Sequence, residues 1–362
     1  MVELSSARGS IRLRPETFIG DVRDGSGLHH MLWGLLANSL DEHIAGHCRR
    51  IDVVLEDGGA ASVEDDGRGI PLFDAEGRPF AEAALTQEHP IPILDDRASQ
   101  EHVGRYGVGL VVVNALSAWL SVDVHRDGLH RRLRYENGHP AGALEVVGPS
   151  ARTGTRMSFS PDGSVFEATW FDTDKIRTHL REISWMMPAL TLTFLDRRTH
   201  VFHEPQGVRA SLEKTRHSWV TPIAEMLVVD EMIGRIRVEG AVEWVRGHAC
   251  EIESFANIER TRDGGTHVEG LLAGLREGLL RADPSWTEVD PKETTRILRD
   301  GLRAVVGVRL CHPTYGLPAK SRLVTPEVKD AVTRVVSGGF EALLARQPAL
   351  LGYLAAHRDR SV

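Results

Sequence analysis

The spacing of apolar residues predicts alternating helices and strands over roughly the first 160 residues. Residues 29–47 form the first predicted helix, with apolar side chains three or four positions apart at Met31, Leu35, Leu36 and Leu40. Residues 50–58 and 60–67 predict two strands joined by a glycine-containing turn. A glycine-opened helix followed by a strand is predicted over 108–128, and another strand over 130–138.

A second α+β unit is predicted to begin near residue 166. Its first elements are a helix over 172–187 and a strand over 189–196, and a later helix covers 270–280. A long final helix is predicted to begin at Thr325 and Pro326, a residue pair typical of an N-cap and a first helical turn.

The composition agrees with two folded domains. The 362 residues exceed the roughly 250 to 300 at which a single core stops growing, so we expect domains at 1–165 and 166–362. Hydrophobic residues make up 41% of the chain, which is enough for two cores. The net charge of -8 provides no overall basic field for nucleic acid, so any contact with DNA needs a local patch.

The cysteines and the apolar runs restrict the compartment. Three cysteines lie far apart at Cys48, Cys250 and Cys311, a spacing that fits neither a disulfide framework nor a zinc site. The first residues lack the apolar segment of a secretion signal, and no apolar run reaches 18 residues. We therefore expect a cytoplasmic protein with no membrane association.

Three stretches have the composition of ligand sites. In Glu64–Pro71, acids end a strand and two glycines open a tight turn, where a carboxylate can accept a hydrogen bond from an exocyclic amine. Val103–Leu110 is glycine-rich and opens a helix, where backbone amides can hold a phosphate. Asn38 and Glu42 share one helical face, where an amide oxygen can join a Mg²⁺ shell. Taken singly, each stretch fits better as a plain turn, a helix start or a solvated helix face.

The order and spacing of these stretches resemble a known family. The ATPase half of the B subunit of DNA gyrase and topoisomerase IV, in the GHKL (Bergerat-fold) family, has similar motifs in the same order as residues 18–48, 65–71, 107–117 and 153–159. Residues 262–270 and 318–329 resemble the transducer domain of the same proteins. The resemblance implies an α+β fold, a GHKL ATP-binding α/β sandwich followed by a transducer domain of ribosomal-protein-S5-like fold.

The resemblance also implies a site for ATP or ADP with Mg²⁺. Asp65 matches the aspartate that hydrogen-bonds the adenine amino group, with Thr155 beside it, and Asn38 matches the Mg²⁺ ligand that bridges the phosphates. Other positions match the remaining nucleotide contacts, which are the turn glycines Gly67 and Gly69, the lid and helix-start glycines Gly104, Gly107 and Gly109, and the transducer lysine Lys320 that reaches the terminal phosphate.

The sequence departs from the family at the phosphate end of this site. Gly34 replaces the general base, a glutamate on the first helix, and Ala37 replaces an aspartate one turn further on. General-base assistance of roughly 10² to 10⁴ in rate is therefore expected to be missing. The lid and the phosphate-sensing loop lose polar groups as well, at Ile91–Ile93, Gln100 and Pro318.

Two residues remain as catalytic candidates. His30 matches a family histidine that contacts the missing glutamate, and it lies one turn before Gly34, where it can orient or activate a water or a hydroxyl. Glu42 is the second candidate, and His29 and Tyr106 are weaker ones.

Two arginines have expected roles outside the chemistry. Arg68 is expected to form a structural ion pair with Asp41 or Glu42. Arg132, together with Asp65, matches family positions that contact coumarin-type inhibitors.

Three functions stay open at this point. The first is a nucleotide-binding protein that hydrolyses ATP slowly or not at all. The second is a repurposed enzyme, whose emptied phosphate end takes another small molecule. The third is an active ATPase of the topoisomerase type with a displaced base, His30 or Glu42. A homodimer or a gyrase-type partner subunit is expected, with no DNA cleavage by this chain by itself.

Overall fold

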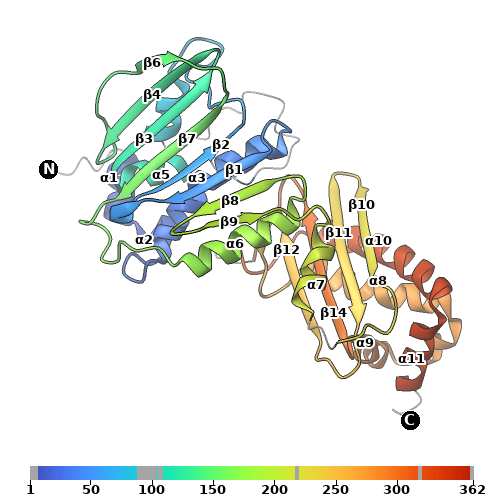
Figure 1. Ribbon diagram of the computed structural model, residues 1–362. Coiled ribbons are helices and arrows are strands. Elements are labelled where there is room, and N and C mark those ends of the chain that lie inside the picture. The colour runs from blue at the N-terminus through green and yellow to red at the C-terminus, as the bar shows by residue number, and fades with distance from the viewer. Residues whose placement is uncertain (1–6, 88–102, 104–108, 217–219, 317–319, 359–362) are drawn as a thin grey trace. The chain divides into compact units, whose positions relative to one another are not determined.

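A computed structural model describes residues 7–87, 103, 109–216, 220–316 and 320–358. Its packing divides the chain into two units, Met1–Glu204 and Pro205–Val362. Each unit has a sheet of its own with helices packed on it, as Figure 1 shows. Within the described residues, no helix is both long enough and apolar enough to cross a bilayer.

The first unit is built on one large sheet. In the part of the chain that the structure describes, the strand order is β5-β4-β3-β7-β2-β1-β8-β9, with β6 paired to β4. The strands are β1 (Arg50–Leu55), β2 (Ala61–Asp65), β3 (Ser117–Arg126), β4 (Leu129–Glu136), β5 (His139–Pro140), β6 (Glu145–Pro149), β7 (Gly154–Pro161), β8 (Thr191–Leu195) and β9 (Thr199–Phe202). The predicted strand pair is confirmed, because β1 and β2 run antiparallel with Ile51 opposite Asp65.

Helices cover this sheet. They are α1 (Ala7–Leu13), α2 (Glu16–Ile19), α3 (Ser26–Ile44), α4 (Phe80–Thr86), α5 (Gly109–Leu116) and α6 (Thr173–Met186). Helix α3 contacts β2 and β7, and α5 contacts β3 and β7. Because the two helices also contact each other, they lie on the same face of the sheet. The helices expected from the apolar spacing at 29–47 and at the start of 108–128 are therefore present.

The packing boundary differs from the sequence-based boundary at 165/166. Strand β8 pairs in parallel with β1, from Arg50 beside Thr191 to Val54 beside Leu195, so residues 166–204 complete the first sheet. The sequence near β8 does not reveal that this strand pairs with the distant β1, because the apolar spacing of β8 is the same whichever sheet it joins.

The second unit has a five-stranded sheet within the described residues, in the order β10-β11-β14-β12-β13. Its strands are β10 (Leu227–Ile233), β11 (Ile236–Trp244), β12 (Glu251–Ala256), β13 (Glu259–Arg260) and β14 (Leu302–Arg309). Its helices are α7 (Val208–Thr215), α8 (Thr266–Ala282), α9 (Pro291–Arg299), α10 (Pro326–Arg346) and α11 (Pro348–Arg358).

Helices α8 and α10 pack closely on each other in this unit. A Cβ added at Gly270 would lie 2.6 Å from the Lys329 carbonyl oxygen, and one at Gly278 would lie 2.7 Å from that of Ser337. Helix α10 begins at Pro326, as expected, but the Thr325 hydroxyl does not cap it, and a further helix, α11, follows it. Thr325 Oγ1 instead accepts a hydrogen bond from the Thr314 backbone amide at 2.8 Å.

Candidate functional site

The strongest candidate site is centred on Asp65, the last residue of β2. Its side chain is 4% exposed. Oδ1 accepts from the Gly67 amide at 3.0 Å and the Thr155 amide at 3.3 Å, and Oδ2 accepts from Ser39 Oγ at 2.8 Å. Burial raises the pKa of this carboxyl to about 6, even though the three hydrogen bonds lower it. Asp65 is therefore a buried acceptor whose hydrogen-bond donors, among the described residues, are all neutral.

Glycines keep the backbone close around this carboxyl. A Cβ at Gly67 would lie 2.9 Å from Asp65 Oδ1, and one at Gly154, which has φ +134°, would lie 2.0 Å from the Asp65 carbonyl oxygen. Gly69 has φ +81°, in the left-handed region that favours glycine. Ile70 follows Gly69, and its backbone amide donates a hydrogen bond to Thr155 Oγ1 at 2.9 Å, which holds this residue in place. The structure thus brings together four residues that the sequence predicted: Asp65, Gly67, Gly69 and Thr155.

The sequence analysis did not identify Ser39 or Gly154. Ser39 follows Leu35 and Leu36 at helical spacing, so it falls on the buried face of α3, where it is 2% exposed. A hydroxyl on a buried face needs a hydrogen-bonding partner, and this pattern is the signal that could have identified Ser39.

The ion pair expected of Arg68 is with Glu42. Arg68 Nη2 donates to Glu42 Oε1 at 2.9 Å, and Arg68 Nε and its backbone amide both donate to Oε2 at 3.1 Å. Asp41 contacts a different part of the chain, where its Oδ1 accepts a hydrogen bond from the Val103 backbone amide at 2.6 Å. Glu42 therefore holds the turn that follows Asp65.

The environment of Gly34 is apolar and close-packed. A Cβ at Gly34 would lie 3.3 Å from Val113 Cγ2 and 3.5 Å from the carbonyl oxygen of Gly109, the first residue of α5. Helices α3 and α5 therefore approach each other closely at this point. Ala37 and Asn38 lie one turn further along α3, and both are half-buried.

The two histidines at the start of α3 differ sharply. His29 is 3% exposed, its Nδ1 donates to the Gly25 carbonyl at 2.8 Å, and its Nε2 accepts from the Asp172 amide at 3.2 Å. Burial lowers the pKa of His29, so it is neutral and both of its ring nitrogens are engaged. His30, by contrast, is exposed on α3.

Lys320 belongs to the second unit, where its Nζ lies 2.6 Å from Glu259 Oε1. The other sequence-based candidates, Gly104, Gly107 and Tyr106, lie outside the described residues, as do Ile91–Ile93, Gln100 and Pro318.

Charged side chains of β3 and β4 lie beside the strand that carries Thr155. Asp123 accepts from Arg132 Nε at 2.7 Å and from His130 Nε2 at 2.6 Å. Burial acts to raise the pKa of Asp123, but the hydrogen bonds from Arg132 and His130 lower it below its usual range. Arg132 is therefore fixed in place by Asp123.

The residues around Asp65 offer a ligand one buried acceptor, the Asp65 carboxylate, with the Thr155 hydroxyl next to it. An amino group of a ligand is the kind of donor that this carboxylate can accept. Among the described residues, no group of three or more His, Cys, Asp or Glu side chains is placed to bind a metal ion.

Two family models match the chain. One, described as "Histidine kinase-, DNA gyrase B-, and HSP90-like ATPase", matches residues 23–164. The other, described as "DNA gyrase B", matches residues 203–357.

Curated relatives match over nearly the whole chain. The B subunit of DNA gyrase from Halalkalibacterium halodurans is 33% identical over 349 residues, which is 94% of this chain and 55% of the relative. The corresponding gyrase protein of Thermotoga maritima is 34% identical over 366 residues, 94% of this chain and 56% of the relative. The chain thus spans about half the length of the curated relatives that it matches.

Solved structures match both units. The 43K ATPase domain of Thermus thermophilus gyrase B, in complex with an aminocoumarin, has a TM-score of 0.82 at 32% identity, over 98% of this chain and 96% of that one. The gyrase B protein of Myxococcus xanthus has a TM-score of 0.80 at 26% identity, over 96% of this chain and 99% of that one.

Proposed function

Because the chain belongs to the family of the DNA gyrase B ATPase domain, we propose that it binds ATP or ADP in its first unit and hydrolyses ATP weakly or not at all. The same match confirms the predicted α+β fold class, a GHKL sandwich followed by a transducer domain. One observation carries the proposal. The acceptor Asp65 is complete and buried, whereas Gly34 and Ala37 stand where the resemblance places the family's carboxylates.

The surroundings of Asp65 favour an adenine base. Two backbone amides engage Oδ1 and the Ser39 hydroxyl engages Oδ2, so the remaining acceptor capacity suits one more donor. The amino group of adenine provides this donor, whereas the oxo group of guanine would place an oxygen against the carboxylate. The glycines Gly67, Gly69 and Gly154 let the backbone pack closely around Asp65 and hold this acceptor in place.

Next to Gly34, the described residues place no side chain that would activate water. The atoms nearest to a Cβ at Gly34 are a methyl group of Val113 and the backbone of Gly109, and none of these atoms can take a proton from water. General-base catalysis is worth roughly 10² to 10⁴ in rate, so ATP would persist once bound. We assign the Mg²⁺ contact to the Asn38 amide oxygen, one turn from Gly34 on the same helix.

A displaced base is the weaker alternative. Glu42 receives three hydrogen bonds from Arg68, so both of its oxygens already serve as acceptors. His30 remains the candidate for this role, because it is exposed one turn before Gly34. A repurposed pocket for another small molecule stays the second alternative, but the close packing of Gly34 against Val113 and Gly109 leaves little of the space on which it rests. A homodimer or a gyrase-type partner subunit belongs to the same proposal.

The test combines binding with turnover. The intact protein is titrated calorimetrically with ATP, ADP and a non-hydrolysable ATP analogue, with and without Mg²⁺, and phosphate release is followed in parallel. We expect Mg²⁺-sensitive binding of ATP without phosphate release, and binding at least about 100-fold weaker in Asp65→Asn, where an amide replaces the acceptor of the base amine.

The other outcomes separate the alternatives. Phosphate release that is lost in His30→Ala would identify an active ATPase with a displaced base. No binding of any nucleotide would overturn the proposal and favour the repurposed pocket.

A further inference from the structure

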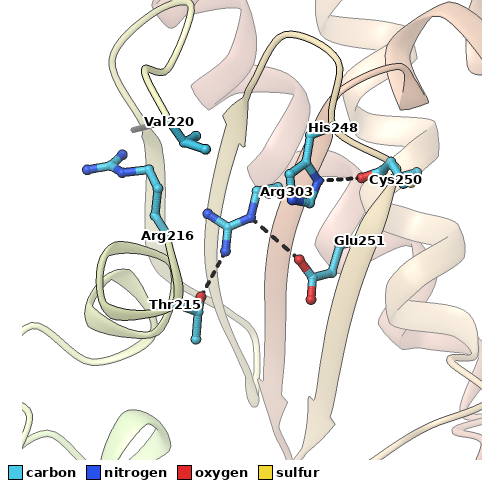
Figure 2. Close-up of a pocket in the computed structure, with 8 residues that line it drawn as sticks. Thr215, Arg216, Val220, His248, Cys250, Glu251 and Arg303 are labelled. Carbon is cyan, nitrogen blue, oxygen red and sulfur yellow. Dashed lines mark hydrogen bonds and ion pairs between the residues drawn. The ribbon is translucent and has the colours of Figure 1, made fainter. Parts of the chain in front are cut away.

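A second pocket lies wholly within the second unit, at the end of α7 and the first residues of β12 and β14. Its volume is about 390 Å³, and it is lined in part by Arg216, Glu251 and Arg303. Figure 2 shows these side chains around the pocket, with Thr215 below Arg303. The sequence analysis did not identify this cluster.

The sheet places a row of three charges on one face. Glu243 of β11 lies opposite Arg303 of β14, and Glu251 of β12 lies beside Arg303 on its other side. Side chains directly across neighbouring strands project from the same face. This face is the one away from the apolar core, because Leu302 and Ala304 on either side of Arg303 belong to that core.

One buried carboxylate serves two guanidinium groups. Glu243 Oε1 lies 2.6 Å from Arg303 Nη1, and Glu243 Oε2 lies 2.8 Å from Arg216 Nη1. The Glu243 side chain is 0% exposed and that of Arg303 is 4% exposed. Two cations that line the pocket therefore share the single buried carboxylate of Glu243.

The second carboxylate of the row is held much more weakly. Glu251 Oε2 lies 3.5 Å from Arg303 Nε, and the Glu251 side chain is 53% exposed. At this distance the hydrogen bond is marginal, and an exposed ion pair contributes little free energy. Thr215 Oγ1, at 2.8 Å from Arg303 Nη2, holds the guanidinium in place independently of Glu251.

The Arg216 guanidinium has N–H groups that can donate hydrogen bonds to a ligand. Its contact to Glu243 uses Nη1, and Nε and Nη2 make no hydrogen bond among the described residues. Planar guanidinium groups pair with carboxylate or phosphate oxygens through two parallel hydrogen bonds. The pocket thus combines a buried, fixed cation with a half-buried cation whose other donors can reach a ligand.

We propose that this pocket binds a small oxyanion, a carboxylate or a phosphate group, at the Arg303 guanidinium with the Nε and Nη2 donors of Arg216 turned to it, and that Glu251 swings away from Arg303 when the anion binds. The half-exposed carboxylate of Glu251 contacts Arg303 when no anion is bound, so it competes with the anion for that guanidinium. The buried Glu243 stays in place and keeps the two guanidinium groups together. The proposal is independent of the nucleotide site of the first unit.

The test uses two variants with opposite expected effects. The intact protein is titrated calorimetrically with inorganic phosphate and, separately, with malonate at low ionic strength. We expect Arg216→Gln to weaken binding about tenfold or more, because a charge-assisted hydrogen bond is lost. We expect Glu251→Gln to tighten binding about threefold to tenfold, because the competing charge is removed.

Matched controls come from α8. Arg281 and Glu277 form an exposed ion pair there, with side chains 52% and 42% exposed. Arg281→Gln and Glu277→Gln make the same charge changes outside the pocket, and neither is expected to change the affinity. A response to only one of the two anions identifies which oxyanion the pocket takes.

Cysteine labelling localises the anion without relying on a variant. Cys250 lines the pocket and is partly exposed, Cys311 is partly exposed elsewhere, and Cys48 is buried. Added anion is expected to slow alkylation of Cys250, read by peptide mass spectrometry, and to leave Cys311 unchanged. The proposal is overturned if neither anion binds, if Glu251→Gln weakens binding as it would for a cationic or zwitterionic ligand, or if Cys250 is not protected.

Discussion

The two halves of helix α3 contact their neighbours in opposite ways. In the C-terminal half, Ser39 donates to Asp65 at 2.8 Å, and Glu42 accepts from Arg68 at 2.9 Å and 3.1 Å. In the N-terminal half, Gly34 presents only backbone, and its neighbours are a methyl group of Val113 and the backbone of Gly109. One half fixes polar groups around an acceptor, and the other half is packed against apolar and backbone atoms at this point.

This difference corresponds to the proposed separation of base recognition from turnover. A buried acceptor is costly to keep, because the carboxylate is desolvated and its three hydrogen bonds compensate for this only in part. The apolar half has no comparable cost. This contrast agrees with the proposal that the site holds a base at Asp65 and does not cleave a phosphate at Gly34.

The largest expected effect is on stability, in Asp65→Asn without ligand. The pKa of Asp65 is raised from 3.8 to about 6 in the folded protein. Its contribution to stability is therefore fully present below pH 3.8 and is lost as the pH rises through 6. Asparagine keeps an oxygen for the Gly67 and Thr155 amides and does not ionise. We expect the variant to be more stable than the wild type by about 1–3 kcal/mol at pH 8, with the difference shrinking towards pH 4.

Denaturant unfolding at several pH values measures this effect. Asp74 is the control, because its hydrogen bonds to Arg78 lower its pKa against the effect of burial. Asp74→Asn is expected to show the opposite sign, a loss of stability that is largest near neutral pH. A variant Asp65→Asn that is less stable than the wild type at pH 8 would contradict the cost assigned to the buried charge.

A smaller effect is expected from Ser39→Ala. The hydroxyl holds Asp65 Oδ2 in position at 2.8 Å and lowers the pKa of that carboxyl. Without it, we expect ADP to bind about threefold to tenfold more weakly at pH 7, a change typical of one lost hydrogen bond. Calorimetry with ADP measures the change, and Ser62→Ala, on the same strand as Asp65, is the control. Equal affinities in the wild type and Ser39→Ala would show that the turn positions Asp65 without this hydroxyl.

The smallest effect is expected at Gly34. Alanine there gains helix propensity of up to about 1 kcal/mol, offset by the 3.3 Å contact with Val113, so we expect a stability change within about 0.5 kcal/mol. Gly154→Ala is the contrast, because its Cβ would lie 2.0 Å from the Asp65 carbonyl oxygen. Gly34→Glu is expected to leave phosphate release at background, since a base does not replace the missing phosphate contacts. A gain of about 100-fold would mean that only the base was missing.

The sequence predicted the features that depend on local residue pattern. The β1–β2 hairpin, helix α3 and the turn around Asp65 follow from apolar spacing and glycine placement, and the structure contains all of them. The roles of Asp65 and Thr155 came from the resemblance. The structure adds two hydrogen bonds of Thr155. Its hydroxyl accepts from the Ile70 amide, and its backbone amide donates to Asp65 Oδ1.

What the sequence did not predict depends on contacts between distant residues. The Ser39–Asp65 hydrogen bond joins a helix to a strand, and the sharing of Glu243 between Arg216 and Arg303 joins three separate elements. Each residue by itself looks like an ordinary polar position. Only the sheet register and the helix packing place them together.

The parallel pairing of β8 with β1 has a consequence for the order of folding. During synthesis, residues 50–55 and 61–65 emerge early and can form their hairpin, but the far edge of β1 stays open until residues 191–195 have left the ribosome. Open strand edges are sites of aggregation, and contacts between distant residues form slowly. The nascent chain must therefore carry an unprotected edge next to the hairpin that ends at Asp65 until residues 191–195 have been made.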